Sequence, residues 1–149
     1  MVHYIKGNLL DSKENYICHQ VNCQGRMGSG VAKQIREKWP AVYDIYRQCA
    51  NSENLGCISS VNIIGNIPIQ TVINMYAQDT YGYDGRRYTS YDAFWSCLGE
   101  IRERVPKDAT IALPDHIGCG LGGANWEVIR TMIEQALGDY EVYIYKLEE

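Results

Sequence analysis

Short apolar stretches rich in β-branched and aromatic residues alternate along this chain with stretches in which apolar residues recur every three or four positions. The first pattern is typical of strands, and the second is typical of helices that bury one face. A turn around Gly65, Asn66 and Pro68 joins two of the strand patterns. The predicted strands span residues 2–6, 16–21, 57–64, 71–76, 110–113 and 141–147.

Two of the helical patterns carry recognisable start and stop signals. One begins after a cap at Thr89 or Ser90 and is closed by Pro106, and the other begins after a cap at Asn125 and ends at Gly138. The apolar residues that recur on one face are Phe94, Leu98, Ile101 and Val105 in the first, and Trp126, Ile129, Ile133 and Leu137 in the second.

An earlier helical pattern carries Val31, Ile35 and Trp39 on one face, and Pro40 interrupts it before a further helical stretch over 43–50. Strands and helices therefore alternate through the chain. This alternation predicts an α/β sandwich with a mainly parallel central sheet. A length of 149 residues is typical of one domain, and we expect residues 1–149 to form a single domain.

Two glycine-rich segments, over 22–31 and 117–123, each follow an apolar run and each precede a helical pattern. Glycines allow the backbone to approach a ligand closely, and a helix N-terminus presents unpaired N–H groups with partial positive charge. Two such loops together favour a nucleotide diphosphate as the ligand. For either loop alone, a turn that needs positive φ is an equally good interpretation.

The common phosphate-binding motifs do not account for these loops. Gly118, Gly120 and Gly123 match G-x-G-x-x-G, but a single strand follows them, which disfavours a dinucleotide-binding oxidoreductase. The chain also lacks the G-x-x-x-x-G-K-[ST] motif of phosphate-binding loops in nucleotide hydrolases.

Composition narrows the possible ligands and cofactors. The net charge of -4 argues against a long nucleic-acid polymer as the main ligand, because counterion release needs a basic surface. The sequence shows neither a membrane-spanning apolar run nor a secretory leader, so we expect a cytoplasmic protein without membrane contact. The six cysteines and three histidines lack zinc-binding spacing, and we expect reduced thiols, no metal and no cofactor.

Several motifs together resemble a known family over essentially the whole chain. They are the segment Lys6-Gly7-Asn8-Leu9-Leu10, the loop from Asn22 to Val31, Pro114 with the loop Ile117 to Gly123, Trp126, and the terminal Tyr143-Ile144-Tyr145. In this order they resemble a macrodomain. The nearest branch contains ADP-ribose 1''-phosphate phosphatases, a terminal ADP-ribose glycohydrolase and antitoxins that remove ADP-ribose from DNA.

The resemblance implies a three-layer α/β/α sandwich with a mixed, mainly parallel sheet that binds ADP-ribose. It places Asn8 and the backbone of Leu9 at the adenine, Tyr145 in a stack on the adenine, and Asn22 at the distal ribose. The residues that it places at the diphosphate are Gly28, Ser29, Gly30 and Val31 in the first loop, and Ile117, Gly118, Cys119, Gly120, Leu121, Gly122 and Gly123 in the second.

The resemblance also implies a hydrolase that acts at the distal ribose, with His19 and Asn22 near the reacting centre. The reaction is either removal of phosphate from ADP-ribose 1''-phosphate or removal of ADP-ribose from a modified macromolecule. Gln78 stands where the glycohydrolase branch has a lysine that forms a covalent adduct, and Gly122 stands where it has an aspartate. The alternative is a reader that binds ADP-ribose or ADP-ribosylated partners without turnover.

Some candidate side chains keep two interpretations. His19 is either an acid–base group or a buried strand histidine, and Cys119 is either a nucleophile paired with His116 or a small residue packed in a phosphate loop. Asp115 and His116, beside the second loop, are weaker candidates for the reacting centre. Asp79 either orients a water molecule or is an exposed loop aspartate. The tyrosine-rich segment over 76–91 either recognises the group on the distal ribose or is a solvated loop whose tyrosines pack on the core.

Overall fold

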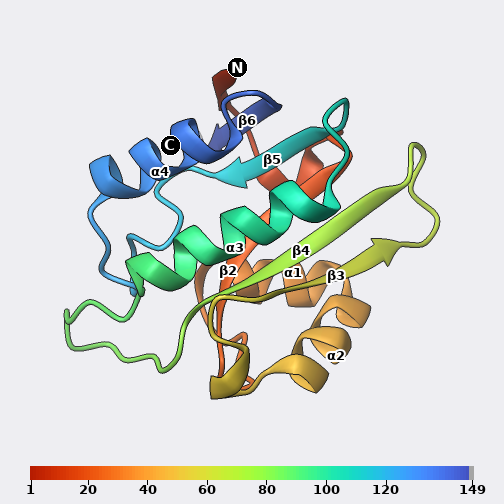
Figure 1. Ribbon diagram of the computed structural model, residues 1–149. Helices are drawn as coiled ribbons and strands as arrows, with labels where there is room; N and C mark the ends of the chain where they lie inside the picture. The colour runs from red at the N-terminus through yellow and green to blue at the C-terminus, as the bar shows by residue number, and fades with distance from the viewer. Residues whose placement is uncertain (148–149) are drawn as a thin grey trace.

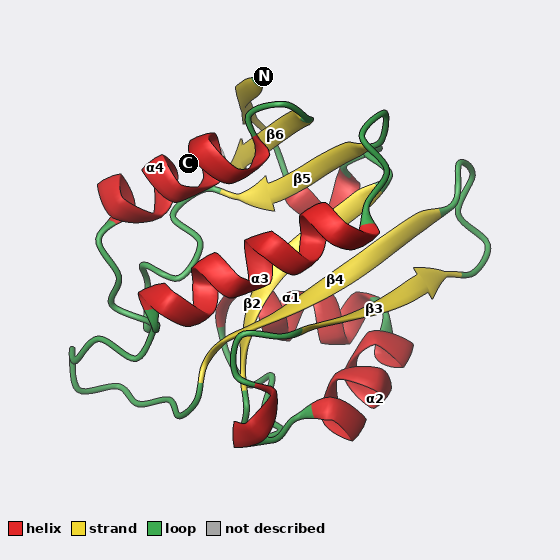
Figure 2. Ribbon diagram, in the orientation of Figure 1, coloured by secondary structure: helices red, strands yellow, loops and turns green. Residues whose placement is uncertain are grey.

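A computed structural model describes residues 1–147 of the chain, which form a six-stranded sheet with helices on both faces (Figures 1 and 2). The strands are β1 (Val2–Lys6), β2 (Tyr16–Asn22), β3 (Ile58–Ile63), β4 (Gln70–Gln78), β5 (Thr110–Pro114) and β6 (Glu141–Lys146). The α-helices are α1 (Gly30–Lys38), α2 (Pro40–Cys49), α3 (Tyr91–Arg104) and α4 (Trp126–Leu137), with short 3-10 helices at η1 (Leu9–Asp11) and η2 (Ser52–Asn54).

The strands follow the order β1-β6-β5-β2-β4-β3 across the sheet. β3 runs antiparallel to β4, whereas the other paired strands are parallel. The chain moves from β2 to β4 on one side and then crosses to β5 on the other side of β2. In open α/β sheets, ligands bind outside the carboxyl ends of the strands at such a reversal. The fold therefore predicts a binding site at the end of the sheet where β2, β4 and β5 finish.

Alternation along the strands divides the core between two faces of the sheet. On β2, Cys18 packs in the cluster beneath α3 and α4, whereas Ile17 and Val21 pack in the cluster beneath α1, α2 and η1. Figure 1 shows α3 and α4 in front of the sheet and α1 behind it. The expected three-layer α/β/α sandwich with a mixed, mainly parallel sheet is thus confirmed.

Most predicted elements appear within one or two residues of their expected bounds. Pro40, predicted as an interruption, forms the first turn of α2, where its missing N–H costs nothing. Ser90 rather than Thr89 caps α3, because its side chain accepts from the N–H of Ala93. The loop over 117–123 precedes α4 as expected, with Ala124 and the N-cap Asn125 between them.

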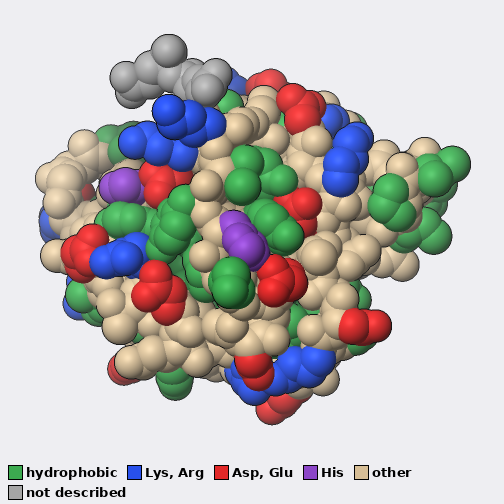
Figure 3. All heavy atoms as spheres, turned by 90° about the horizontal axis from the view of Figure 1, so that it is seen from above, with side chains coloured by type: hydrophobic (Ala, Val, Ile, Leu, Met, Phe, Trp, Pro, Cys, Tyr) green, Lys and Arg blue, Asp and Glu red, His purple; other side chains and the backbone are tan. Residues whose placement is uncertain are grey.

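The end of the sheet where β4 begins carries a hydrophobic projection. The β3–β4 hairpin exposes Ile64, Ile67 and Ile69 to solvent, and Figure 3 shows hydrophobic side chains gathered on the projection to its right.

Within residues 1–147, no helix combines the length and the apolar character that crossing a bilayer requires.

Candidate functional site

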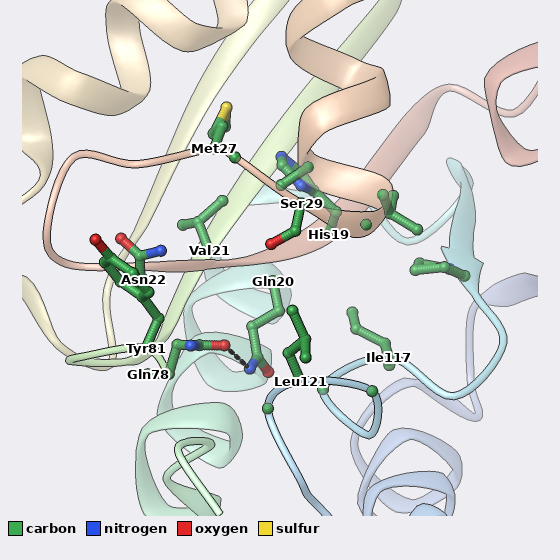
Figure 4. A pocket seen from close by; sticks show the side chains of 18 of the residues that line it. His19, Gln20, Val21, Asn22, Met27, Ser29, Gln78, Tyr81, Ile117 and Leu121 are labelled. Atoms are coloured by element: carbon green, nitrogen blue, oxygen red, sulfur yellow. Dashed lines mark hydrogen bonds between the residues drawn. The ribbon is translucent and has the colours of Figure 1, made fainter. Parts of the chain in front are cut away.

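A cavity of about 650 Å³ lies at the carboxyl ends of β2, β4 and β5, where the strand order reverses (Figure 4). Asn22 and Gln78 are register partners at one side of it, and the second glycine-rich loop forms the other side. The pairing of β2 with β4 shifts between Val21 and Asn22, so Ala77 forms a bulge here, as strands often do next to functional sites. The residues that line the cavity are His19, Gln20, Val21, Asn22, Arg26, Met27, Gly28, Ser29, Gly30, Val31, Ala32, Gln78, Tyr81, Gly82, Tyr83, Pro114, Asp115, His116, Ile117, Gly118, Gly120, Leu121 and Gly122.

The first glycine-rich loop delivers the N-terminus of α1 to this cavity. Ser29 is the N-cap, yet its hydroxyl makes no capping hydrogen bond, and Gly30 begins the helix with a φ of 62°. The first N–H groups of a helix have no intrahelical partner, and no side chain among residues 1–147 caps them here. Partial positive charge therefore faces the cavity, which suits an anionic ligand.

Side chains hold the first part of this loop, and its N–H groups at Gln24 and Gly25 donate to two of them, Asn22 and Tyr46. The buried hydroxyl of Tyr46 donates to Oδ1 of Asn22 at 2.7 Å and accepts from the N–H of Gly25 at 3.1 Å. The Asn22 amide donates in turn to the carbonyl of Arg26 at 2.9 Å. Asn22 thus organises the loop, whatever it contributes to a ligand, and Tyr46 was not predicted because it lies 24 residues further along the chain.

The second glycine-rich loop also presents N–H groups without partners. Turns use the N–H groups of Cys119 and Gly123, which donate to His116 and Gly120. In the described part of the chain, those of Gly118, Gly120, Leu121 and Gly122 have no acceptor, and these four residues line the cavity. The loop is therefore suited to bind anionic oxygens through its backbone.

Close packing explains three of the glycines in this loop, since a Cβ on Gly123 would lie 2.7 Å from the carbonyl oxygen of Arg86. A Cβ on Gly122 would lie 2.6 Å from the carbonyl oxygen of Gly118, and one on Gly118 would lie 2.7 Å from Oε1 of Gln20. Gly118 also has a φ of 76°, which side chains rarely adopt. Gly120 differs, because a Cβ there would meet open space.

A side-chain network fastens the second loop to the centre of the sheet. Nε2 of Gln20 donates to Oε1 of Gln78 at 2.8 Å (Figure 4) and to the hydroxyl of Thr89 at 2.7 Å. That hydroxyl donates to the carbonyl of Gly118 at 2.8 Å, and the N–H of Thr89 donates to Gly122. Thr89 therefore acts as a clamp on the loop rather than as a helix cap.

His19 lies inside the sheet and belongs to a chain of buried polar groups. Its Nε2 lies 2.6 Å from Oδ1 of Asn74, and the Asn74 amide donates to Ser59. Ser59 bonds the hydroxyl of Tyr76, which donates to the carbonyl of Tyr46. Because Oδ1 only accepts, Nε2 carries the proton and Nδ1 holds a lone pair.

Burial sets the charge of His19. Its side chain is almost inaccessible, and desolvation lowers the pKa of the imidazole to about 4, so it is neutral at pH 7. Nδ1 is buried without a hydrogen-bond partner in the described residues, and the residue contributes to the cavity wall. His19 is thus a buried strand histidine that also borders the site. Its role in catalysis stays a prediction.

Five of the predicted site residues do not line the cavity. Asn8 caps η1, its side chain accepting from the N–H of Leu10, while Leu9 is buried. The hydroxyl of Tyr145 bonds Glu14. Contact of these residues with a ligand stays a prediction, and it needs a ligand that extends beyond the cavity. The predicted residues outside the lining are Asn8, Leu9, Cys119, Gly123 and Tyr145, and those within it are His19, Asn22, Gly28, Ser29, Gly30, Val31, Ile117, Gly118, Gly120, Leu121 and Gly122.

Two of the weaker candidates, Cys119 and Asp79, lie outside the cavity lining. Burial, with the charge of Asp115, raises the pKa of Cys119 to about 11, which opposes a nucleophilic thiolate and agrees with the packed-residue interpretation. The Asp79 carboxylate accepts from the Ser52 hydroxyl and the Gln24 amide, so it braces the first loop. Among residues 1–147, no group of three or more His, Cys, Asp or Glu side chains is placed to hold a metal ion.

The structure brings Asp115 and His116, which the sequence offered as weaker candidates, to the wall of the cavity. Both line the cavity, with Nδ1 of His116 at 2.6 Å from Oδ2 of Asp115. The imidazole stacks on the indole of Trp126, with ring centroids 4.9 Å apart, and His116 has a φ of 56°. A strained backbone, a carboxylate and an aromatic face together fix this ring at the β5 side of the cavity.

Sequence comparison identifies the fold family. The Macro domain family model matches residues 18–133, which include both glycine-rich loops. The chain belongs to the Macro domain family. The resemblance seen in the sequence is confirmed, and both loops that line the cavity of this macrodomain lie inside the matched region.

Three relatives are similar to this macrodomain in sequence, and one solved structure is similar to it in fold. An uncharacterised 17.5 kDa protein of Enterobacteria phage T4 is 28% identical over 99% of this chain and 97% of its own length. A DNA ADP-ribosyl glycohydrolase of Thermus aquaticus is 25% identical over 98% of this chain, which spans 41% of that relative. An ADP-ribose 1''-phosphate phosphatase of Aspergillus clavatus is 34% identical over 42% of this chain and 31% of its own length. The solved macrodomain of Thermus aquaticus DarG superposes with a TM-score of 0.79 at 25% identity, covering 98% of both chains.

The Tyr46 hydroxyl provides a test of how the first loop is held. Tyr46→Phe should lower the free energy of unfolding by about 1–3 kcal/mol, because it removes the part-buried hydrogen bond to Oδ1 of Asn22 and leaves the N–H of Gly25 without its acceptor. It should also speed amide hydrogen exchange at Gly25 in the first loop. Tyr140→Phe is the matched control, since its buried hydroxyl donates to Val105 far from the loop. Equal exchange of the loop amides in both variants would contradict the assignment.

The buried His19 predicts a specific acid sensitivity. Below its ordinary pKa of 6.5 the unfolded chain binds a proton that the folded chain resists until about pH 4, so acid favours unfolding in this window. Between pH 7 and pH 4 the wild type should lose up to about 3 kcal/mol more stability than His19→Gln. Urea unfolding of both proteins across this pH range measures the difference. The same loss in both would show that His19 titrates normally.

Proposed function

We propose that this macrodomain binds ADP-ribose and hydrolyses a bond at its distal ribose, removing ADP-ribose from a modified macromolecule. One observation carries the proposal: two loops with unpaired N–H groups face each other across one cavity. A diphosphate has oxygens on both phosphorus atoms, and backbone donors from two sides would hold it without a positively charged side chain. The volume of about 650 Å³ lies in the range of small-molecule and cofactor sites.

The carboxyl end of β4 is the proposed position of the distal ribose. Asn22 and Gln78 meet there, and the resemblance places the ribose at Asn22. The Gln78 amide is engaged on both sides, accepting from Gln20 and donating to the carbonyl of Thr80. Gln78 therefore helps to hold the loops at this end of the sheet in place.

The titratable groups of the cavity favour water as the nucleophile. The described lining contains no lysine, so a Schiff base with an opened ribose lacks its amine. His19 supplies a neutral imidazole whose Nδ1 is buried without a hydrogen-bond partner in the described residues, and we propose that it takes the proton of a water that enters beside this wall of the cavity. Its low pKa makes it a weak base, which implies slow turnover.

The extent of the sequence matches favours release of ADP-ribose over phosphatase activity. The match to the DNA ADP-ribosyl glycohydrolase of Thermus aquaticus spans nearly the whole chain, whereas the phosphatase match spans less than half. The chain covers about two fifths of that glycohydrolase, so its substrate is carried over here as a proposal.

A reader of ADP-ribosylated partners is the second candidate. The missing lysine and the low basicity of His19 favour it, because both weaken the chemical step and leave the binding loops intact. Measured turnover separates the two functions.

Gly120→Glu tests the binding site. A Cβ at Gly120 meets open space and its φ is not positive, so the variant should fold while placing a carboxylate at the second loop. Like charge should then weaken ADP-ribose binding by about 100-fold or more in calorimetry. Gly99→Glu adds the same charge on the exposed side of α3 and should bind normally. Normal binding by Gly120→Glu would exclude this loop from the diphosphate site.

Turnover is tested with two substrates, an oligonucleotide bearing one ADP-ribosylated base and ADP-ribose 1''-phosphate. We expect release of ADP-ribose from the first, slowed about ten-fold or more in His19→Gln, which keeps an N–H for Asn74. Phosphate release from the second substrate instead would assign the phosphatase reaction. Binding without either product would establish the reader. Borohydride added during turnover should leave the protein mass unchanged, since no lysine lines the described cavity.

A further inference from the structure

A second cavity, of about 230 Å³, lies at the end of the sheet where β4 begins. Residues 10–13, which run from η1 toward β2, form one wall, and residues 65–68 in the turn between β3 and β4 form another. Figure 1 shows this turn projecting at its right. Lys38 at the end of α1 and Gln70 at the start of β4 complete the lining. In the described structure, the lining shares no residue with the cavity between the glycine-rich loops.

Hydrogen bonds from Gln70 join the two walls of this second cavity. Its Nε2 donates to the carbonyl of Ser12 at 2.8 Å and to that of Glu14 at 2.9 Å. Its Oε1 accepts from the amide of Asn66 at 2.8 Å. Gln70 is only 5% exposed, so these bonds are shielded from water. The cavity is therefore a built part of the fold and not a gap between two independent loops.

Ser12 brings an unpaired buried hydroxyl to the wall. The residue is 4% exposed, and its Oγ has no hydrogen-bond partner among residues 1–147. Its backbone is fully engaged, because the N–H donates to Leu9 and the carbonyl accepts from Gln70. Burying a hydroxyl without a hydrogen bond is unfavourable, and an alanine here would avoid that cost. A group that enters the cavity and accepts a hydrogen bond would satisfy this hydroxyl.

The charges of the lining favour an anion as that group. Lys13 is exposed and has no carboxylate within 4.0 Å in the described part of the chain. Nζ of Lys38 donates to the carbonyl of Leu10 at 2.7 Å and lies 3.7 Å from Oδ1 of Asp11. Asp11 is the one carboxylate in the described lining, against two ammonium groups. The lining therefore carries a net positive charge.

The size of the cavity and the arrangement of its donors narrow the class of anion. A volume of about 230 Å³ is several times the ~30 Å³ of one water and below the ~300–1,000 Å³ of drug-sized ligand sites. Donors come from separate segments, with Ser12 and Lys13 on one wall and the unpaired N–H groups of Gly65 and Ile67 on the other. A planar carboxylate presents two oxygens in one plane, whereas a phosphate group presents three or more in different directions. A phosphate group matches donors that approach from two walls.

We propose that this second cavity binds a phosphate group, either as inorganic phosphate or as the monoester of a small molecule. The Ser12 hydroxyl donates to one phosphate oxygen, and the Lys13 ammonium pairs with the anion. Lys38, held by Leu10 and Asp11, adds positive charge to the wall. The inference goes beyond the proposed function, because this site lies at the other end of the sheet and needs no ADP-ribose.

The test is a titration of ¹⁵N-labelled protein with inorganic phosphate, followed by NMR at constant ionic strength. Saturating shifts should appear at the amides of residues 12, 13, 65 and 67 with one common dissociation constant. A parallel titration with methyl phosphate distinguishes the two sources of the group. Tighter binding of methyl phosphate assigns a small-molecule monoester, and tighter binding of inorganic phosphate assigns the free anion.

Two variants test the assigned ligands. Ser12→Ala and Lys13→Gln should each weaken binding at these amides about ten-fold or more, because each removes a donor to the anion. Lys33→Gln is the matched control, since it removes an exposed lysine outside both cavities and should bind phosphate normally. In phosphate-free buffer, Ser12→Ala should unfold at the same urea concentration as the wild type or at a higher one. A lower midpoint would show that the hydroxyl already has a partner, which rejects its role as a ligand.

Three further results would overturn the phosphate site. Shifts confined to the two glycine-rich loops would place the anion in the first cavity only. Equal shifts with potassium chloride would show an adventitious ion only. Unchanged affinity in both Ser12→Ala and Lys13→Gln would remove the two ligands on which the site depends. Failure of the protein to bind ADP-ribose would reject the proposed function and leave this site as it stands.

Discussion

The first glycine-rich loop depends on the hydroxyl of Tyr46, which bonds it at both Asn22 and Gly25. An anion-binding loop must keep its N–H groups unpaired, so it cannot be stabilised by the backbone hydrogen bonds that hold ordinary turns. Tyr46 resolves this conflict, because it contacts the loop at Asn22 and Gly25 and leaves the N-terminus of α1 open. The carbonyl of the same residue ends the polar chain that begins at His19. The loop and the buried histidine are therefore held from one position on α2.

Strand β2 connects the hydrogen-bond networks that support both sides of the cavity. Its alternating side chains point to opposite faces of the sheet, so His19 joins the network beneath α1 and α2 while Gln20 bonds Gln78 and Thr89 on the other face. Both glycine-rich loops are thereby fixed to one strand, which is paired on each side. Such a strand moves little, and the separation of the two loops is set by the sheet.

The fold could be predicted from the sequence because its signals are local. Periodicity, the Ser90 and Asn125 caps, and Gly138 depend on residues a few positions apart. The site was predicted where the glycines mark it, and Asp115 and His116 were named as weaker candidates, but the supporting roles of Tyr46 and Thr89 were missed. Tyr46, Thr89 and the Asp115–His116 pair act across long sequence separations or through a stack on Trp126, and no local pattern reports such contacts. The burial of His19 was left open for the same reason, since a strand pattern does not say which face a cavity touches.

Because most of the strands are parallel, the residues that form the cavity between the glycine-rich loops gather at one end of the sheet and are absent from the other end of the described structure. All the groups that build the cavity lie at the carboxyl ends of β2, β4 and β5, whereas the β3–β4 hairpin with Ile64, Ile67 and Ile69 precedes β4 at the opposite end. Insertions, fusions and affinity tags placed in that hairpin would leave the paired strands and both loops in register. An attachment at that end would therefore leave the spacing of the two anion-binding loops unchanged.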